Sequence, residues 1–195
     1  MAKNLERYRV RILCEDKAQY EFMRNFLTNQ GVINNRRILP CLQLPEGTQS
    51  GEQFVKENFS SEYQKYTRAH ENIILVVVQD IDKRYSTFEE AKNAFEIIIR
   101  SEGLNGFTSS DKLMLVFPKR NIETWLEWLK QDYPTRTVSE DNDYKMRNRD
   151  LPFGKFGKHA SDLYTKSLND SSVCDTAPKS LVSACEEFKN LCVKL

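Results

Sequence analysis

The segment from Ile73 to Val78 constrains the fold of this chain more than any other part of the sequence. All of its residues are Ile, Leu or Val. Such a run predicts a strand that is buried on both faces, as in a parallel sheet covered by helices. The run ends at Gln79, and two carboxylates, Asp80 and Asp82, follow directly. Loops at the carboxyl ends of such strands are where open α/β sheets bind ligands.

A second predicted strand, residues 8–14, also ends in acidic residues. Glu15 and Asp16 follow it directly. Parallel strands end at the same edge of their sheet, so we expect these acids to lie near Asp80. Asp16 has two interpretations, because it either helps to hold a cation or caps the first helix through its side chain.

Strands and helices alternate along the first two thirds of the chain. The expected strands cover residues 8–14, 37–44, 73–79 and 112–117, and the expected helices cover residues 17–30, 52–69, 87–103 and 122–130. This order predicts a mostly parallel sheet with helices on both faces. Pro40 favours an edge position for its strand, Gly31 favours a C-terminal cap, and Asn121 is expected to cap the fourth helix.

The last third of the chain has a different character. Residues 131–156 are polar and show no clear period, whereas residues 158–195 predict two helices joined at 169–172. We therefore divide the chain into an α/β domain at residues 1–130 and an extension at residues 131–195. The extension is expected to consist of a polar loop and helices packed on the domain.

Composition narrows the class of protein. The 195 residues include 39% hydrophobic residues, which argues against disorder. Lys and Arg total 29 against 28 Asp and Glu, so any polyanion must meet a local basic patch. No apolar stretch approaches the ~20 residues that span a bilayer, and the N-terminus has no apolar h-region, so we expect a cytoplasmic protein. Five cysteines without CxxC spacing and two histidines favour thiols over a zinc site.

The acids at the two strand ends suit a hard divalent cation. Mg²⁺ commonly takes one or two carboxylates together with waters and phosphate oxygens. Asp80 and Asp82 are the candidate ligands, and Glu15 could hold the metal or act as a general acid or base if crowding raises its pKa. The alternative is that the acids only form turns or cap helices. Their presence at two separate strand ends favours a site.

At this point the sequence resembles a known family. A strand ending in Glu15, a long helix and an apolar strand ending in an Asp-x-Asp motif resemble the TOPRIM domain. Topoisomerases, primases and overcoming-lysogenization-defect (OLD) nucleases share that domain. Residues 116–125 (VFPKRNIETW) are similar to the strand and RxxEAW-type helix of small stand-alone TOPRIM-like proteins from bacterial defence and mobile-element loci. The resemblance covers roughly residues 7–130.

The resemblance implies Mg²⁺- or Mn²⁺-dependent phosphodiester chemistry on DNA or RNA. It makes Asp80 and Asp82 metal ligands, and Glu15 a general acid or base as well as a ligand. Some of these proteins work with an ATPase, which implies an ATPase partner and a role in phage defence. The chain departs from the family at Asp16, where many TOPRIM sequences have Gly. The tyrosine-bearing domain of a topoisomerase and the zinc module of a primase have no counterpart in this sequence, so hydrolysis is favoured.

Glu123 and four basic residues extend the predicted site. Glu123 begins the helix after the fourth strand, where it is either a further metal ligand or a partner of the positive helix end. Lys119 and Arg120 precede it, and we expect them to offset charge in catalysis. Lys83 and Arg84 follow the Asp pair and are expected to contact nucleic acid. Solvated surface charge is the alternative for all four basic residues.

A local basic patch is predicted between residues 144 and 166. Cations that meet phosphates, alternating with aromatic rings that stack on bases, make a groove for single-stranded nucleic acid. We expect Lys155 and Lys158 to contact nucleic acid. A surface loop with two anchoring aromatics is the equal alternative. The residues concerned are Lys145, Arg147, Arg149, Lys155, Lys158 and Lys166, with Tyr144, Phe153, Phe156 and Tyr164.

The sequence thus favours a metal-dependent nuclease built on a TOPRIM-like α/β sheet. One alternative is a non-catalytic subunit that docks a partner protein and whose acids only cap helices. The other is a receiver-like regulator in which Asp80 accepts a phosphoryl group beside Glu15 and Asp16, which would leave Asp82 without a role. The oligomeric state is open, and a homo-oligomer is one of the expectations.

Overall fold

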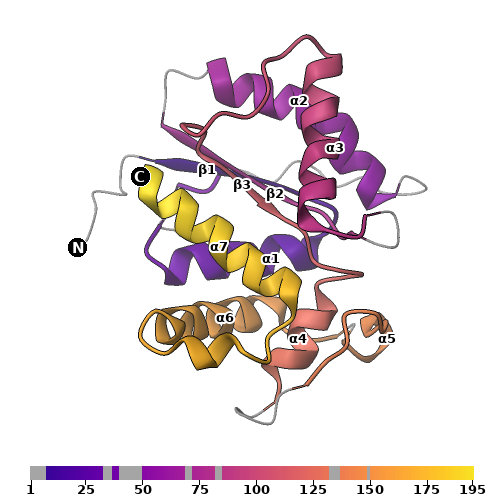
Figure 1. Cartoon of the computed structure of the whole chain (residues 1–195), viewed down its shortest axis with the longest axis vertical. Coiled ribbons are helices and arrows are strands. Elements are labelled where there is room, and N and C mark those ends of the chain that lie inside the picture. The colour runs from indigo at the N-terminus through magenta and orange to yellow at the C-terminus, as the bar shows by residue number, and fades with distance from the viewer. Residues whose placement is uncertain are drawn as a thin grey trace.

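The computed structural model describes residues 8–32, 37–39, 50–68, 72–81, 85–131, 137–148 and 150–195. Figure 1 labels the α-helices and the strands along the chain. In order, the elements are β1 (Arg9–Cys14), α1 (Lys17–Asn29), α2 (Gly51–Arg68), β2 (Ile73–Val78), α3 (Phe88–Ser101), β3 (Leu113–Val116), α4 (Glu123–Leu129), α5 (Lys145–Asn148), α6 (Phe153–Ser167), the 3-10 helix η2 (Ser171–Cys174) and α7 (Lys179–Lys194).

The three described strands form a parallel sheet in the order β1-β2-β3. Val78 at the end of β2 pairs with Cys14 on one side and Val116 on the other, so the three strands end at one edge. Ile38 forms a parallel bridge with Val10 on the free side of β1. The predicted parallel sheet is therefore confirmed. Residues 40–44 of the expected 37–44 strand, including Pro40, lie outside the described residues.

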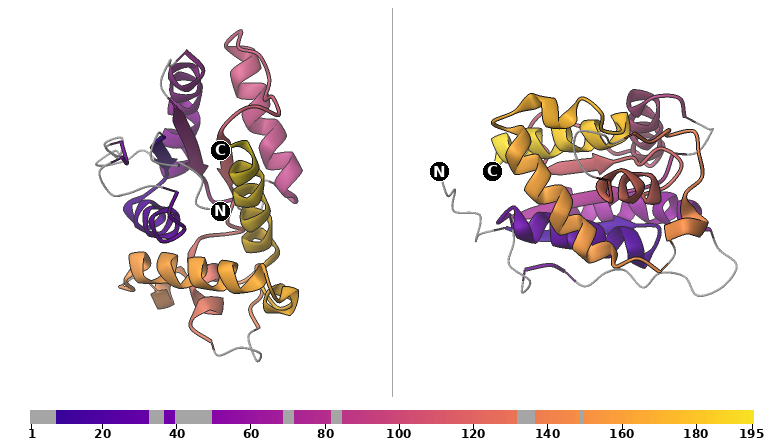
Figure 2. Two further views of the ribbon diagram at one scale, coloured as in Figure 1. Left: turned by 90° about the vertical axis from the view of Figure 1, so that its left-hand side faces the viewer. Right: turned by 90° about the horizontal axis from the view of Figure 1, so that it is seen from below.

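Helices cover both faces of the sheet, as the sequence predicts. Figure 1 shows α2 and α3 above the sheet and α1, α6 and α7 below it, and Figure 2 shows the same layers from two further directions. Ile74, Val76 and Val78 of β2 belong to the lower core, whereas Leu75 and Val77 belong to the upper core. All five are 0% exposed. Burial on both faces explains why the apolar run has no polar alternation.

The extension at residues 131–195 shares the lower core of the α/β domain. Helix α6 packs so closely on α1 that a Cβ added to Gly157 would lie 2.1 Å from the carbonyl oxygen of Phe22. The ring of Phe188 on α7 lies 5.0 Å from Phe26 and 5.2 Å from Tyr164, centroid to centroid. These contacts join the first helix and the last helices of the chain in one apolar layer.

Two details of the predicted secondary structure are wrong. The polar segment 131–156 is expected to be a loop, but its described residues include α5 and the start of α6, where Phe153 is buried in the core. Asn121 does not cap α4. The N-cap position is Ile122, without a side-chain hydrogen bond, and the Asn121 side chain instead donates from Nδ2 to Asp143 and accepts at Oδ1 from the hydroxyl of Thr124.

Other expected features are present. Asp16 caps α1 by accepting a hydrogen bond from the N–H of Gln19, and Gly31 takes a φ of 70° just beyond that helix. Within the described parts of the chain, no helix has the length and apolar character needed to cross a bilayer. No disulfide joins the cysteines in those parts, and Cys41 lies outside them.

Candidate active site at the carboxyl edge of the sheet

A closed ring of three hydrogen bonds links the ends of β1 and β2 to the first turn of α1. The backbone N–H of Glu15 donates to Oε1 of Gln19 over 3.0 Å. The side-chain Nε2 of Gln19 donates to Oδ1 of Asp80 over 2.9 Å. The backbone N–H of Asp80 donates to Oε1 of Glu15 over 3.0 Å, which closes the ring. The structure thus brings together two acids that are distant in sequence, as their strand-end positions predict.

The start of α2 holds Glu15 from the other side. A Cβ added to Gly51, the first residue of α2, would lie 2.6 Å from the Cβ and 2.9 Å from the carbonyl oxygen of Glu15. Real Cβ atoms do not approach this closely, so only glycine fits at this position. The close approach fixes the backbone of Glu15 between α1 and α2.

A polar cavity of about 220 Å³ opens beside the ring. Acidic side chains and basic side chains both face it. Among the described residues, neither Arg120 nor Lys145 forms an ion pair, although carboxylates line the same cavity. The cavity therefore suits a ligand that carries both positive and negative charge. Its lining consists of Glu15, Glu52, Asp80, Arg120, Asn121, Asp143 and Lys145.

The two acids of the ring have raised pKa values. Burial raises the pKa of Glu15 from 4.5 to about 7, against the hydrogen bond from Asp80 that lowers it, and the nearby charge of Asp16 raises it further. Burial also raises the pKa of Asp80 well above its ordinary value, and the charge of Glu15 adds to the effect. Perturbed acids in a cavity are typical of catalytic or metal-binding sites. A carboxyl with a pKa near 7 can both accept and donate a proton at neutral pH.

Glu123 lies behind this cavity rather than in its lining. It begins α4 and is only 6% exposed. Burial raises its pKa, while its own backbone N–H and Lys145 lower it. Its charge is one of the smaller effects that raise the pKa of Asp80. The helix-end interpretation and the ligand interpretation of Glu123 both stay open.

The basic residues Lys119 and Arg120, which are predicted to act in catalysis, have different environments. Lys119 pairs with Asp141 over 3.0 Å and does not line the cavity. Arg120 does line it, and its φ of 67° is unusual for a residue with a side chain. Its backbone N–H donates to the carbonyl of Ile81 over 3.1 Å, which holds this strained residue next to the end of β2. Left-handed backbone at such a residue costs on the order of 1 kcal/mol and is common at functional sites.

The segment 137–148, from the extension, supplies Asp143 and Lys145 to the cavity. The Nδ2 of Asn121 donates to Asp143 over 3.0 Å, and the backbone N–H of Lys145 donates to the same oxygen over 2.9 Å. The hydrogen bond from Lys145 and the one from Asn121 lower the pKa of Asp143 despite a small burial effect. Asp143 is therefore an ionised anchor that fixes the backbone of Lys145.

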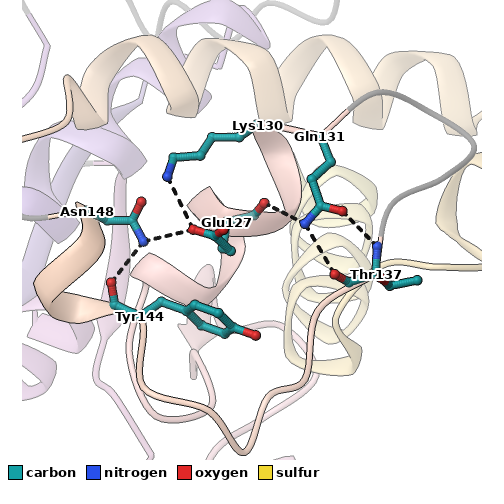
Figure 3. A network of polar contacts seen from close by, with 6 residues as sticks. All are labelled: Glu127, Lys130, Gln131, Thr137, Tyr144 and Asn148. Carbon is teal, nitrogen blue, oxygen red and sulfur yellow. Dashed lines mark hydrogen bonds and ion pairs between the residues drawn. The ribbon is translucent and has the colours of Figure 1, made fainter.

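A network of side chains attaches this segment to α4, as Figure 3 shows. Asn148 donates from Nδ2 to Glu127 over 3.2 Å and to the carbonyl of Tyr144 over 2.9 Å. Gln131 donates to the carbonyl of Thr137 over 3.2 Å and accepts from its N–H over 2.9 Å. The segment is thus attached on both sides of Lys145, to α4 through Asn148 and to Gln131, just beyond that helix, through Thr137.

Glu140 of the same segment also caps α7. Its carboxylate accepts hydrogen bonds of 3.0 Å from the backbone N–H groups of Lys179 and Ser180. The hydroxyl of Ser180 in turn accepts from the indole N–H of Trp125 on α4 over 2.8 Å. Trp125 is 1% exposed and is therefore a core residue.

The predicted nucleic-acid contacts are not brought together at this cavity. Lys155 and Lys158 are exposed on α6 and do not line it. The rings interleaved with them are largely buried: Phe153 is 7%, Tyr144 8% and Tyr164 8% exposed. These aromatics therefore pack in the core rather than offer faces for base stacking. Asp82, Lys83 and Arg84 lie outside the described residues.

The sequence analysis missed Gln19, Glu52 and Asp143 as site residues, and it placed Lys145 in a basic patch rather than at this cavity. Gln19 stands three residues after the N-cap Asp16, where a capping box places Glu or Gln. That pattern signals a side chain that turns back toward the strand end, and the structure shows it doing so at Glu15. Lys145 had no such signal, because its place depends on contacts of the 137–148 segment with α4.

Comparisons with known proteins identify no relative. No protein-family model, no curated protein and no solved structure matches the chain. In the parts of the chain that the structure describes, no three Asp, Glu, His or Cys side chains are grouped closely enough to hold a metal ion by themselves. Asp82 is not among those residues.

Proposed function

We propose that this chain is a Mg²⁺- or Mn²⁺-dependent nuclease that hydrolyses phosphodiester bonds in DNA or RNA. The observation that carries the proposal is the cavity in which Glu15 and Asp80 face Arg120 and Lys145. A divalent cation beside a phosphate has the complementary pattern of charge. Carboxylates suit the cation and the two basic side chains suit the phosphate.

The residues present fit a divalent cation. The ring of hydrogen bonds uses Oε1 of Glu15 and Oδ1 of Asp80, which leaves Oε2 and Oδ2 without a bond in the ring. Mg²⁺ is usually bound by one or two carboxylates, with waters and substrate oxygens completing its shell. Asp80 and Glu15 would hold the ion, with Asp82 and Glu123 as the further proposed ligands. When bound, such an ion polarises a phosphate and lowers the pKa of water.

The chain's own residues have three proposed roles. Glu15 is proposed either as a ligand of the ion or as the base that accepts a proton from the attacking water, because its one oxygen outside the ring serves one of these roles at a time. Arg120 and Lys145 bind the phosphate and offset the negative charge that grows on it. The strained backbone of Arg120 and the anchor Asp143 hold the two basic residues, Arg120 and Lys145, in place before substrate arrives. Lys119, which pairs with Asp141, has a weaker claim to a catalytic role than Arg120.

The finer points of the proposal rest on the sequence resemblance. We place the sheet and its acids in a TOPRIM-like arrangement, with nucleic acid as substrate and an ATPase as partner protein in phage defence. The parallel sheet and the strand-end acids support this assignment. Fold resemblance alone does not define an activity, so the site residues carry the functional part of the proposal.

A cleavage assay tests the proposal. Labelled single-stranded and double-stranded DNA and RNA are incubated with the native chain, with Asp80→Asn and with Glu15→Gln, each in Mn²⁺. Cleavage by the native chain and its loss in both variants is the expected result. Glu187→Gln is the matched control, since Glu187 is also a half-buried acid with a pKa raised by burial, but lines a different cavity. Cleavage that survives Asp80→Asn would contradict the proposal.

A further inference from the structure

The side chain of Gln19 is completely buried at the base of the proposed metal site. It is 0% exposed, and both of its polar atoms are bound within the ring. Its Oε1 accepts from the backbone of β1, and its Nε2 donates to the carboxylate that follows β2. The amide therefore has one orientation, because exchanging its oxygen and nitrogen would break both hydrogen bonds.

This fixed amide restricts the carboxylate of Asp80. Oδ1 accepts the hydrogen bond from Gln19, so rotation of the carboxylate about its last bond would break that bond. The backbone N–H of Asp80 occupies Oε1 of Glu15 in the same way. Within the described part of the chain, each acid therefore has one oxygen without a hydrogen bond in the ring, Oδ2 in Asp80 and Oε2 in Glu15. The two acids are set to bind a cation through one oxygen each.

Binding through single oxygens distinguishes between cations. Mg²⁺, and Mn²⁺ in similar sites, needs near-octahedral geometry at short distances, which carboxylates satisfy through one oxygen each. Ca²⁺ takes more ligands in flexible geometry and often binds both oxygens of one carboxylate. A carboxylate that is held by a neighbouring amide can bind Mg²⁺ or Mn²⁺ through one oxygen. It cannot easily turn to bind Ca²⁺ through both oxygens.

We infer that Gln19 is a positioning residue that makes the site selective for Mg²⁺ and Mn²⁺ over Ca²⁺ by holding Asp80 to single-oxygen binding. The inference rests on the proposed function, because it assigns the metal to the same cavity. It goes further by naming the residue that sets the choice of metal. Gln19 does not touch the ion and acts only through the orientation of Asp80.

The test compares two glutamine variants from the same helix. Gln19→Met removes the amide but keeps the volume of the side chain. Gln30→Met makes the same change at the end of α1, where the amide of Gln30 donates to the carbonyl and hydroxyl of Ser161 over 2.8 and 2.7 Å. It controls for the loss of a structural glutamine away from the site. Mn²⁺ and Ca²⁺ affinities of both variants and of the native chain are measured by titration calorimetry.

The expected result is a change in selectivity. The native chain and Gln30→Met bind Mn²⁺ more tightly than Ca²⁺. Gln19→Met loses about tenfold in Mn²⁺ affinity, as removal of partners around metal ligands commonly does. Its Ca²⁺ affinity stays within about threefold of the native value, since the freed carboxylate can bind through both oxygens. A general loss of structure would weaken both ions equally, so the ratio separates positioning from folding.

The test distinguishes a failure of the role assigned to Gln19 from a failure of the proposed function. An unchanged ratio of Mn²⁺ to Ca²⁺ affinity in Gln19→Met overturns the role of Gln19 and leaves the proposed metal site in place. An equal loss for both ions also overturns it, because the residue then only stabilises the fold. A native chain that binds neither ion overturns the proposed function, and the inference with it.

Discussion

The backbone N–H of Asp80 donates a hydrogen bond to the side chain of Glu15 over 3.0 Å. This bond crosses from the end of β2 to the end of β1 and keeps two acids next to each other, where burial penalises the charged form of each. Acids in such a position cost stability, and under the proposed function they bind a cation.

The first prediction concerns the stability of the metal-free protein. The pKa of Glu15 is about 7 in the folded chain and 4.5 in its ordinary state, so the folded protein binds more protons between these values. The free energy of unfolding therefore falls as pH rises from about 4.5 to about 7. Glu15→Gln removes this loss and is expected to be more stable than the native chain near pH 8, by roughly 1–3 kcal/mol. Urea unfolding at a series of pH values measures the effect.

Glu62→Gln is the control for this first prediction. Glu62 is 4% exposed and pairs with Arg11 over 3.2 Å and with Lys65 over 2.7 Å. Removing a buried acid that has partners leaves those partners without compensation, so this variant is expected to be less stable than the native chain. If the free energy of unfolding changed in the same direction in both variants, burial of the Glu15 carboxylate would not be what destabilises the native chain.

The second prediction concerns pH and metal binding. A carboxylate must lose its proton before it binds a cation, so Mn²⁺ competes with protons at Glu15 and Asp80. Mn²⁺ affinity is expected to rise by about tenfold or more between pH 6 and pH 8, since the pKa of Glu15 lies at about 7. Thermal shift with Mn²⁺ at each pH measures the change. A pH-independent shift would show that the ion binds elsewhere.

The third prediction concerns the contact between α2 and Glu15. Gly51→Ala is expected to destabilise the protein by about 1–3 kcal/mol, because its Cβ would lie 2.6 Å from the Cβ of Glu15. Helix propensity alone predicts the opposite, a gain of up to about 1 kcal/mol. Gly154→Ala is the control, since its Cβ would meet the side-chain amide of Asn25 at 2.7 Å, which can move aside. Denaturant unfolding of both variants gives the comparison.

The fourth prediction concerns the basic side of the cavity. Lys145→Met is expected to weaken binding of a short oligonucleotide by about tenfold in Mn²⁺, because one phosphate contact is lost. Mn²⁺ affinity without the oligonucleotide is not expected to fall by more than a few fold, since Lys145 holds no metal. Lys189→Met on the exposed face of α7 is the control and should bind as the native chain does. Equal oligonucleotide binding by both variants would place the substrate elsewhere.

Much of the fold could be predicted because buried positions of a strand require apolar residues, which leave a pattern in the sequence. The unbroken run at Ile73–Val78 indicates a strand covered on both faces, and alternate residues do enter the two cores. The same pattern predicts that Glu15 and Asp80 meet, because parallel strands end at one edge. These features depend on local pattern and on sheet topology alone.

The rest of the site depends on contacts between distant segments, which leave no local pattern. Lys145 reaches the cavity only because Asn148 bonds to Glu127 and Asp143 bonds to Asn121. The predicted cap at Asn121 was wrong, since its side chain bonds to the distant Asp143 and to the hydroxyl of Thr124 rather than to a backbone N–H of α4. Sequence reasoning therefore finds the acids Glu15 and Asp80, and it misses the contacts that bring Lys145 to the same cavity.

Mn²⁺ binding to the native chain and to Asp80→Asn, measured by titration calorimetry near neutral pH, tests the central claim most directly. The account predicts that the native chain binds Mn²⁺, that Asp80→Asn does not, and that the control Glu187→Gln binds as the native chain does. A cleavage assay is a less direct test, since a chain without its partner can be silent. Absence of Mn²⁺ binding by the native chain, or equal binding by Asp80→Asn, would contradict the account.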